Sequence, residues 1–583
     1  MNYTLKTDQG AKKSLRAGLE ILAPMIRAER AGLLRAIPAI LLNCGAVLTA
    51  PILIARALDT AVPKHDRDAL LRSAALVLVI YMAGVVGSYL QVKVMGVVGR
   101  RMLYSLRNAL FEKLQQLPVA FFNQNKAGDL ISRVNNDTDK LNQFVSQAMM
   151  QFVGSVAMMT GVGIFILSLN WKLGLAALMP ALGVLVVTQV TGPWVRKKNA
   201  KSLASLGALS GEIQESMQNF KVIAAFHRAD YFRTKFEAAN EKNYEASVSA
   251  GYANNLFMPL YGLAMILAQL TVITYGVSLI QAGEASSGLL IGFLLYVNSF
   301  YGPLRQLATV WSSFQMAVAG LERISQVLAL ESNLKQVPSE AEGGGAIVEF
   351  RDVSFHYPDG KEVLNHVSFT LEPGKSYALV GPTGGGKTTT AMLMGRLYDP
   401  TEGKVLLNGR DIRSYDAEER TKKVGFILQE PFLFSGSVRD NITYGNREYQ
   451  NLNNEELRGV LEAAHFEKLL LRFPEGLDTK VSVGSASLSL GQKQLVAFLR
   501  AVLRKPDLLI LDEATANIDT VTEGLMEEML EQLPARTTKV IIAHRLNTID
   551  KVDQIFFVNS GGVNLAGSME HAVELLLHGK RES

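Results

Sequence analysis

YALVGPTGGGKTTTAMLMGRLY, residues 377–398, determines the fold of the second half of the chain. Its residues 381–388 fit the pattern G-x-x-x-x-G-K-[ST], between an apolar run typical of a strand and a run typical of a helix. Glycines in such a loop let backbone N–H groups approach phosphate oxygens, because no Cβ holds the chain away. The motif in this context predicts a phosphate-binding loop between a strand and a helix.

The side chains of this loop have separate predicted roles. Lys387 brings a positive charge to the β- and γ-phosphate oxygens, and the Thr388 hydroxyl is a ligand for Mg²⁺. The residues predicted to contact the nucleotide here are Gly381, Pro382, Thr383, Gly384, Gly385, Gly386, Lys387, Thr388 and Thr389.

Downstream runs supply candidate catalytic groups. LLILDE, residues 508–513, is an apolar strand that ends in two carboxylates. We expect Asp512 to hold the metal and Glu513 to polarise an attacking water. His544 follows the apolar run KVIIA and is a candidate γ-phosphate contact. A strand that ends in acids or a histidine is common, so these assignments depend on the phosphate loop in the same chain.

The chain from residue 347 onward alternates short β-branched runs with amphipathic runs. This alternation predicts an α/β domain with a largely parallel core sheet. The strand-like runs are VEFRDVSFHY, SYALVG, KVLLNG, LLILDE and TKVIIAH.

Composition indicates a membrane-spanning part joined to a soluble part. Of the 583 residues, 48% are hydrophobic and 19% are charged, too apolar for an ordinary soluble enzyme. The net charge of +5 is small for this length and does not favour nucleic acid as a partner. Cys44 is the one cysteine, so an intrachain disulfide is excluded. The polar N-terminal stretch lacks the apolar core of a secretory signal.

Six apolar stretches before residue 320 are each near the length of a spanning helix. They cover about residues 36–57, 74–92, 152–169, 173–190, 258–280 and 289–310. We expect a cytoplasmic segment at 1–35, a six-helix transmembrane domain at 36–325, a linker at 326–346 and a nucleotide-binding domain at 347–583.

Basic residues are unevenly distributed between the loops. Segments 93–144 and 192–250 carry eight and nine Lys or Arg, whereas 281–287 carries none. Basic loops stay inside, so both termini and the nucleotide-binding domain are predicted to be cytoplasmic. Spans two to five are expected to continue as helices into the cytoplasm.

These motifs together resemble the ABC transporters. The resemblance is specific in LSLGQKQ (488–494), LLILDEATANID (508–519) and IIAHRL (541–546), and it extends from about Leu19 to Leu576. The six spans resemble the half-transporter of the exporter type. The resemblance implies an ATP hydrolase that couples ATP and Mg²⁺ to transport across a bacterial plasma (inner) membrane.

The resemblance also implies roles for single residues. Tyr357 matches the aromatic residue that stacks on adenine, and Gln429 matches the glutamine that senses Mg²⁺ and the attacking water. Asp519 matches a loop that communicates between two nucleotide sites. Segments 121–141 and 219–232 match the two inside loops with coupling helices, the second of which docks on the partner's cassette.

The signature element departs from the family pattern LSGGQ. Here it reads LSLGQ: Ser489, Gly491 and Gln492 are kept for nucleotide binding, and Leu490 replaces a glycine. In the upstream V-G-E-x-G pattern Ser485 replaces the glutamate, and Gly385 stands where the family often has serine. In the family a signature serves the ATP bound to the partner chain. An intact phosphate loop beside an altered signature resembles the hydrolytically intact chain of heterodimeric multidrug exporters; a homodimer with two weaker sites is the alternative.

The substrate is predicted only as a class. Drugs, lipids and hydrophobic peptides all fit apolar spans. An importer of siderophore-like compounds and a homodimeric lipid flippase are the alternatives. Polar residues within spans are the leads for a pathway, since such residues usually face the bundle or a wet cavity; they are Asn43, Gln269, Asn298, Arg305 and Gln306.

Overall fold

A computed structural model describes residues 3–5, 23–339, 344–358, 360–482, 488–512, 520–542, 551–566, 571 and 574. The chain divides into two compact units. The cassette unit comprises Met1–Leu5, Gln116–Lys126 and Leu330–Ser583, and the helical unit comprises Lys6–Gln115 and Ala127–Ala329.

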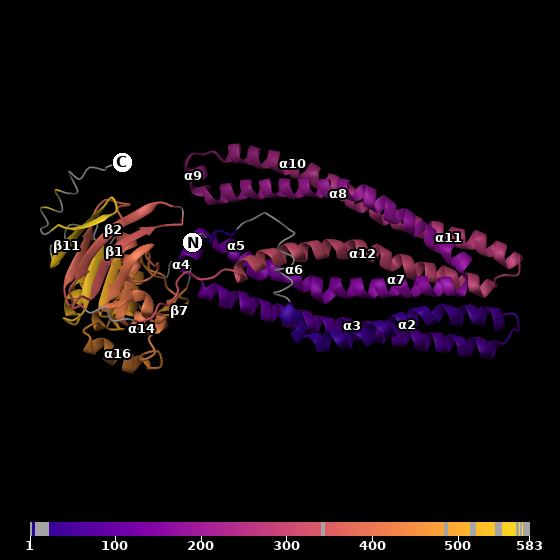
Figure 1. Cartoon of the computed structure of the whole chain (residues 1–583), viewed down its shortest axis with the longest axis horizontal. Helices are drawn as coiled ribbons and strands as arrows, with labels where there is room; N and C mark the ends of the chain where they lie inside the picture. Colours follow the sequence, from indigo (N-terminus) through magenta and orange to yellow (C-terminus); the bar gives the residue numbers. More distant parts are fainter. Residues whose placement is uncertain are drawn as a thin grey trace. The chain divides into compact units, whose positions relative to one another are not determined.

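The helical unit consists of long helices and a few short helical segments, joined by short turns (Figure 1). They are α2 (Arg30–Thr60), α3 (Arg67–Gln116), α5 (Ala127–Ser132), η1 (Arg133–Asp137), α6 (Thr138–Gln143), η2 (Phe144–Ala148), α7 (Met149–Leu169), α8 (Trp171–Gln218), α9 (Phe220–Ala225), α10 (Ala229–Asn255), α11 (Phe257–Gln281) and α12 (Ser287–Leu328). The described residues contain six helices long and apolar enough to cross a membrane, which confirms the six predicted spans.

The apolar windows of these six helices are only 6% to 39% buried within the chain. Apolar faces that the chain itself leaves uncovered fit a lipid environment, where no hydrophobic penalty applies. The chain is therefore a multi-pass integral membrane protein. The helices also run far beyond a bilayer's thickness: α3 has 50 residues and α8 has 48. The predicted helical continuation of the inside loops is confirmed.

Local sequence explains the tight hairpin between α7 and α8. Asn170 alone separates the two helices, and its side-chain Oδ1 accepts a hydrogen bond from the Leu173 N–H at 3.1 Å. An asparagine at this position caps the new helix by satisfying one of its free N–H groups. Pro180 lies within α8 without ending it, as bundled spans allow.

Aromatic residues of spans five and six mostly stabilise helix packing. Phe293, Tyr296 and Tyr301 are at most 3% exposed and belong to a core cluster of α7, α8, α11 and α12. The Tyr301 hydroxyl donates to the Ala177 carbonyl at 3.0 Å. Among the polar leads, Gln269 Nε2 donates to Asn298 Oδ1 at 3.4 Å, so these two amides face one another.

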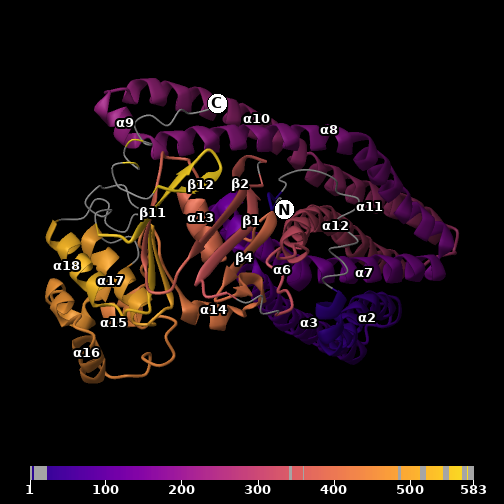
Figure 2. The same ribbon diagram turned by 60° about the vertical axis from the view of Figure 1, so that its left-hand side comes forward.

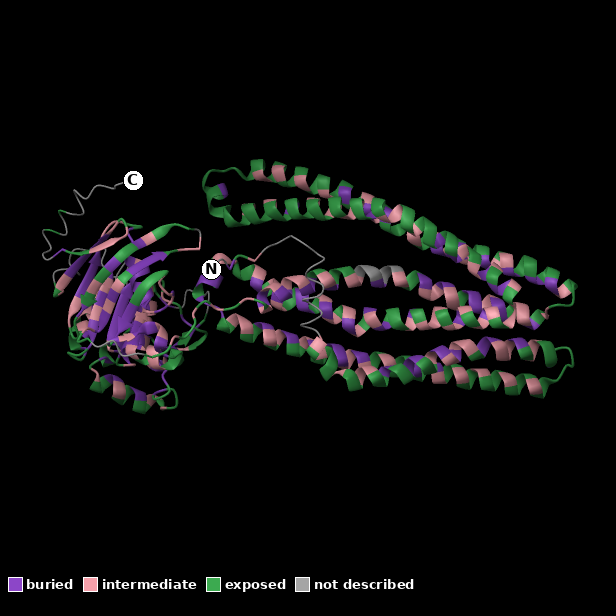
Figure 3. Cartoon of the chain, in the orientation of Figure 1, coloured by how far each residue is buried: buried purple, intermediate pink, exposed green. Residues whose placement is uncertain are grey.

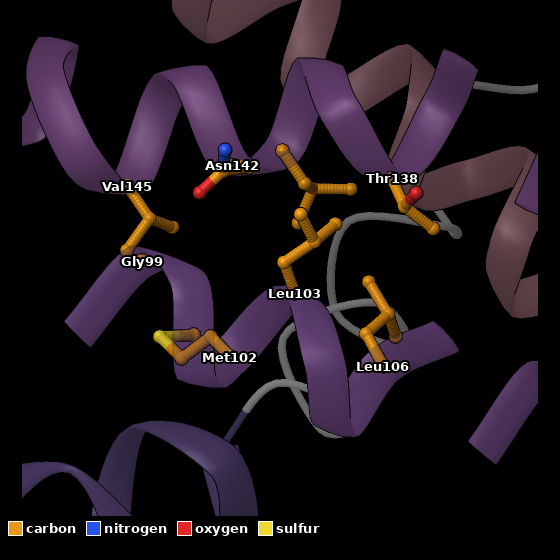
Figure 4. A pocket seen from close by; sticks show the side chains of 8 residues that line it. Gly99, Met102, Leu103, Leu106, Thr138, Asn142 and Val145 are labelled. Carbon is orange, nitrogen blue, oxygen red and sulfur yellow. The ribbon is translucent and has the colours of Figure 1, made fainter. Parts of the chain in front are cut away.

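A small gap lies between α3 and the α6–η2 segment (Figure 4). Gly99, Met102 and Leu106 line it from α3, and Asn142 and Val145 line it from the facing segment. Its volume of about 10 Å³ is about the least that a cavity needs to hold one water. The gap is a packing imperfection, far too small for a transported compound.

An ion-pair cluster fastens the α5–η1 segment to α12. Arg133 is 2% exposed, and its Nε lies 2.9 Å from Asp129 Oδ2. Arg323 of α12 reaches Asp137 Oδ2 at 3.1 Å, and Lys140 reaches Asp137 Oδ1 at 2.9 Å. Buried charges need such partners, because an unpaired charge away from water is costly. The cluster fixes how this segment lies on α12.

In the part of the chain that the structure describes, the cassette unit is built on two sheets and a short antiparallel pair of strands (Figure 2). The strands are β1 (Val348–His356), β2 (Glu362–Leu371), β3 (Ser376–Val380), β4 (Glu402–Leu407), β5 (Arg410–Asp411), β6 (Val424–Ile427), β7 (Gly436–Ser437), β8 (Lys480–Val481), β9 (Leu508–Asp512), β10 (Thr538–Ile542), β11 (Gln554–Asn559) and β12 (Gly562–Leu565). The six-stranded sheet has the order β12-β11-β3-β10-β9-β6 and is parallel apart from β12; the second sheet has the order β2-β1-β4-β5 and is antiparallel. The predicted α/β fold with a largely parallel core sheet is confirmed.

The helices of the cassette unit cover this framework. They are α4 (Val119–Gln124), α13 (Lys387–Met394), η3 (Ile412–Ser414), α14 (Ala417–Lys423), α15 (Val438–Ile442), α16 (Asn454–Ala463), η4 (Glu467–Arg472), η5 (Gly476–Asp478), α17 (Leu490–Val502) and α18 (Thr520–Gln532). In Figure 2, α15 to α18 gather on one side of the sheet. Their apolar faces and the inner face of β9 form one core. Figure 3 shows buried residues, in purple, along the strands of this unit.

Candidate nucleotide site

The phosphate loop follows β3, the strand between β11 and β10 in the parallel sheet. Gly386, at φ +110°, is the N-cap residue of α13, a conformation that favours glycine. A Cβ added at Gly381 would lie 2.0 Å from the Val558 carbonyl oxygen, and one at Gly385 would lie 2.6 Å from the same atom. These glycines let the loop lie directly on the end of β11.

Lys387 occupies the inside of this loop. It is 5% exposed, and its Nζ donates to the carbonyls of Gly381 at 2.8 Å and Pro382 at 3.0 Å. The ammonium group is thus held within the loop whose N–H groups would meet an anion. The loop, the helix N-terminus and the lysine together fit the phosphate chain of a nucleotide.

Two oxygen ligands for a cation meet at the end of β9. Thr388 Oγ1 donates to Asp512 Oδ1 at 3.3 Å, and Asp512 is 3% exposed. Parallel strands end at one edge of a sheet, which brings Asp512 to the loop after β3. One hydroxyl and one carboxylate fit Mg²⁺, which takes few protein ligands and completes its shell with water and phosphate oxygens.

Tyr357 lies beside the phosphate loop. Its hydroxyl is 3.0 Å from Thr389 Oγ1 of α13. Its ring packs edge-on against Phe355 and Tyr398, with centroids 5.0 Å and 5.5 Å away. Tyr357 remains partly exposed beside the helix that follows the phosphate loop, and its predicted stacking on a base stays a prediction.

Tyr398 links this aromatic cluster to α4. Asn123 Nδ2 donates to the Tyr398 hydroxyl oxygen at 3.0 Å, and burial raises the pKa of that hydroxyl above its ordinary value. The sequence patterns did not point to Tyr398, although it is the last residue of the 377–398 stretch. A polar tip on an aromatic residue just after a phosphate-binding helix was the available signal.

The remaining predicted site residues fall into two groups. Gln429 follows β6 and is exposed. Glu513, Asp519 and His544 lie outside the described residues, as does Ser485. The roles of these residues stay predictions.

The signature element forms the start of α17. Ser489 is its N-cap residue: its Oγ accepts from the Gln492 N–H at 3.2 Å, and the Gln492 side chain accepts from the Ser489 N–H at 2.8 Å. This capping box satisfies two free N–H groups. Gly491 is buried, whereas Leu490 is 43% exposed. An apolar side chain therefore projects at the helix N-terminus.

The short helix α9 carries a second exposed apolar surface. Phe220, Val222 and Phe226 are 66%, 55% and 74% exposed. Large exposed apolar side chains at α9 and its C-cap residue make this segment a candidate interaction surface.

The fold and site define a membrane protein whose bundle of spanning helices is fused to a phosphate-loop nucleotide-binding unit. A family profile described as the ABC transporter transmembrane region matches residues 33–304, and one described as ABC transporter matches residues 364–516. The chain belongs to the ABC transporter family. It is a fused half-transporter that binds ATP and couples ATP hydrolysis to transport. Half-transporters of this family act as dimers.

Curated relatives match along most of the chain. A fatty acid ABC transporter ATP-binding/permease protein of Mycobacterium bovis is 33% identical over 85% of this chain and 78% of its own length. A multidrug resistance ABC transporter ATP-binding and permease protein of Lactococcus lactis is 30% identical over 85% and 84%. An ATP-dependent lipid A-core flippase of Aromatoleum aromaticum is 32% identical over 90% and 86%.

Proposed function

We propose that this chain is the hydrolytically intact half of a heterodimeric exporter that moves hydrophobic or amphipathic compounds out across the bacterial plasma (inner) membrane. The observation that supports this proposal most directly is a contrast between two places. Lys387, Thr388 and Asp512 are assembled at the phosphate loop, whereas Leu490 is exposed in the signature element. One half-site is ready for nucleotide. The element that serves the other site carries a bulky side chain where the backbone has to approach phosphate.

The segments of the chain and the residues of the nucleotide site have separate proposed roles. Residues 36–325 cross the membrane, 326–346 connect, 347–583 bind the nucleotide, and 1–35 lie on the cytoplasmic side. Thr388, Asp512 and Gln429 would hold Mg²⁺, which would neutralise charge on the phosphates. Glu513 and His544 act on the attacking water and the γ-phosphate, Tyr357 stacks on the base, and Asp519 communicates between sites.

Two observations support a dimer and the substrate class. The exposed apolar turn of α9 is suited to dock on a partner's cassette. The three relatives are named for fatty acids, multidrug resistance and a lipid, which share apolar or amphipathic character. A lipid flippase is the second candidate, which the name of the Aromatoleum aromaticum relative favours.

Purifying this chain alone tests the heterodimer. We expect the chain alone to hydrolyse ATP slowly, because no intact signature faces its phosphate loop. A stable homodimer with steady ATP turnover would contradict the proposal. The chain that co-purifies from the native membrane is expected to carry an intact LSGGQ and to lack a carboxylate after its metal aspartate.

Leu490→Gly separates the two assemblies. In a heterodimer whose competent site uses the partner's signature, the substitution leaves the ATP hydrolysis rate within about two-fold. In a homodimer both sites contain Leu490, and the rate rises several-fold. Lys493→Gly is the control, because it also introduces a glycine into the first turn of α17. Leu495→Gly is unsuitable, because Leu495 is fully buried.

Transport direction is tested in vesicles of known orientation. Export predicts ATP-dependent accumulation of a lipophilic bisbenzimide dye inside inside-out vesicles. ATP-dependent loss of a preloaded compound from those vesicles would indicate import. A flippase predicts movement of labelled lipid between leaflets with no dye accumulation.

A further inference from the structure

We propose that Tyr3 is a positioning residue that ties α4 to the segment leading into the nucleotide-binding fold, so that both respond together to the nucleotide. All the groups concerned lie within the cassette unit. Tyr3 is 1% exposed, although the side chain is large and carries a polar hydroxyl. A tyrosine buried to this degree needs partners for its hydroxyl, and their location shows what it connects.

One set of contacts joins Tyr3 to the end of α4. The Tyr3 N–H donates to Gln124 Oε1 at 2.7 Å, and Asn125 Nδ2 donates to the Tyr3 carbonyl at 3.0 Å. The next link is the Leu5 N–H, which donates to Asn125 Oδ1 at 3.1 Å. The Tyr3 ring meets the fully buried Phe121 edge-on, with centroids 6.4 Å apart. Residues 3–5 thus lie against α4 through backbone bonds and ring packing.

The hydroxyl of Tyr3 makes the second set of contacts, with residues 331–333. It accepts from the Asn333 N–H at 2.8 Å and is placed to donate to Asn333 Oδ1 at 2.9 Å or to the Glu331 carbonyl at 3.2 Å. Burial raises the pKa of this hydroxyl, so it stays protonated and able to donate. One residue therefore joins two segments that are about two hundred residues apart in the sequence: its backbone bonds the end of α4, and its hydroxyl bonds residues 331–333.

The position of α4 matters because its other contact leads to the nucleotide. Asn123 donates to Tyr398, whose ring packs on Tyr357 beside the phosphate loop. A shift of the aromatic cluster is passed to α4 through this bond, and Tyr3 passes it on to residues 331–333. Contiguous hydrogen bonds and packed rings are the contacts through which such coupling travels, and a substitution along them changes it.

Tyr3→Phe tests the bridge while preserving the fold. Phenylalanine keeps the ring on Phe121 and the backbone bonds to Gln124 and Asn125, and it removes only the bonds to residues 331–333. Tyr415→Phe is the matched control, because Tyr415 is 2% exposed and its hydroxyl donates to the Leu407 carbonyl at 2.7 Å within the nucleotide-binding fold. Both variants are made in the full chain and assembled with the co-purifying partner in lipid vesicles.

Two rates are compared: ATP hydrolysis and ATP-driven uptake of the bisbenzimide dye into inside-out vesicles. For Tyr3→Phe we expect hydrolysis within about two-fold of the unmodified protein and dye moved per ATP reduced about five-fold, the effect of one lost buried hydrogen-bond set. Tyr415→Phe is expected to lower thermal stability and to leave the ratio of dye moved to ATP hydrolysed unchanged. An unchanged ratio in Tyr3→Phe would overturn the proposal.

Amide hydrogen exchange supplies a readout that needs no transported compound. With ATP and vanadate, residues 116–126 and 330–337 are expected to become protected together in the unmodified protein. In Tyr3→Phe, 116–126 keep this response and 330–337 lose it. If the unmodified protein moves no dye, the export proposal fails and exchange alone decides the role of Tyr3. If both segments become equally protected in Tyr3→Phe, the Tyr3 hydroxyl does not connect α4 to residues 331–333.

Discussion

The N-termini of α13 and α17, two helices of the cassette unit, differ in backbone conformation and in the side chains around them. The α13 terminus starts at Gly386 in a left-handed conformation and has a buried lysine folded back into the loop. The α17 terminus starts at Ser489 in an extended conformation, with a side-chain capping box and Leu490 projecting. Both ends carry the positive pole of a helix dipole.

The difference shows that a helix N-terminus alone does not make a phosphate site. At α13 the backbone itself is shaped for an anion, and a cation adds to the field. At α17 two of the free N–H groups are already bonded within the chain, and an apolar side chain stands beside the others. We therefore expect substitutions at the first terminus to have far larger effects than substitutions at the second.

Lys387→Met is expected to have the largest effect. Removing the ammonium group from the loop lowers ATP hydrolysis by about 10²- to 10³-fold, as for loss of a main transition-state donor. Hydrolysis by the assembled transporter and ATP binding measured with a fluorescent analogue both report it. The matched change at the other terminus is Lys493→Met in the first turn of α17, for which we expect at most about a two-fold change. Similar losses of ATP hydrolysis in Lys387→Met and Lys493→Met would show that the two termini do not differ in function.

Glu513→Gln is expected to separate binding from turnover. An amide cannot accept the proton of the attacking water, so hydrolysis falls about 10²-fold while ATP binding is kept. Binding in the presence of Mg²⁺ and steady-state hydrolysis are measured on the same preparation. Near-normal hydrolysis in this variant would refute the assignment of Glu513.

Gly381→Ala is expected to have an intermediate effect. The added Cβ would lie 2.0 Å from the Val558 carbonyl oxygen, so the loop or β11 has to shift. Such overpacking costs about 1–3 kcal/mol, and we expect ATP affinity to fall by about ten-fold. Gly384→Ala is the control, since a Cβ there meets none of the described residues within 4 Å, although its φ of +83° adds strain. Equal affinities for Gly381→Ala and the unmodified chain would show that the loop adapts.

The sequence was sufficient for features that depend on local pattern. Span length, strand–helix alternation and the glycine spacing of the loop each impose a requirement on neighbouring residues, and the fold confirms the six spans and the parallel sheet. The short interval between the apolar stretches 152–169 and 173–190 likewise agrees with the single residue, Asn170, that separates α7 from α8.

Features that depend on distant partners were not predictable in the same way. Tyr3 bonds Asn333, and Arg323 pairs with Asp129 and Asp137, across nearly two hundred residues or more. No periodicity marks such pairs, because each residue alone resembles an ordinary surface group. The structure brings Thr388 to Asp512 only because the parallel strands order their ends at one edge.

Ser489→Ala is expected to have the smallest effect and to decide what the second terminus does. Loss of the cap costs about 1 kcal/mol of stability. Ser437→Ala removes a capping box of the same kind from α15, so the two variants are matched in thermal unfolding. If Ser489 only caps α17, nucleotide affinity of the dimer is the same in both. If its hydroxyl also reaches the partner's nucleotide, only Ser489→Ala weakens nucleotide retention, and the difference between the two variants measures the contribution of that hydroxyl.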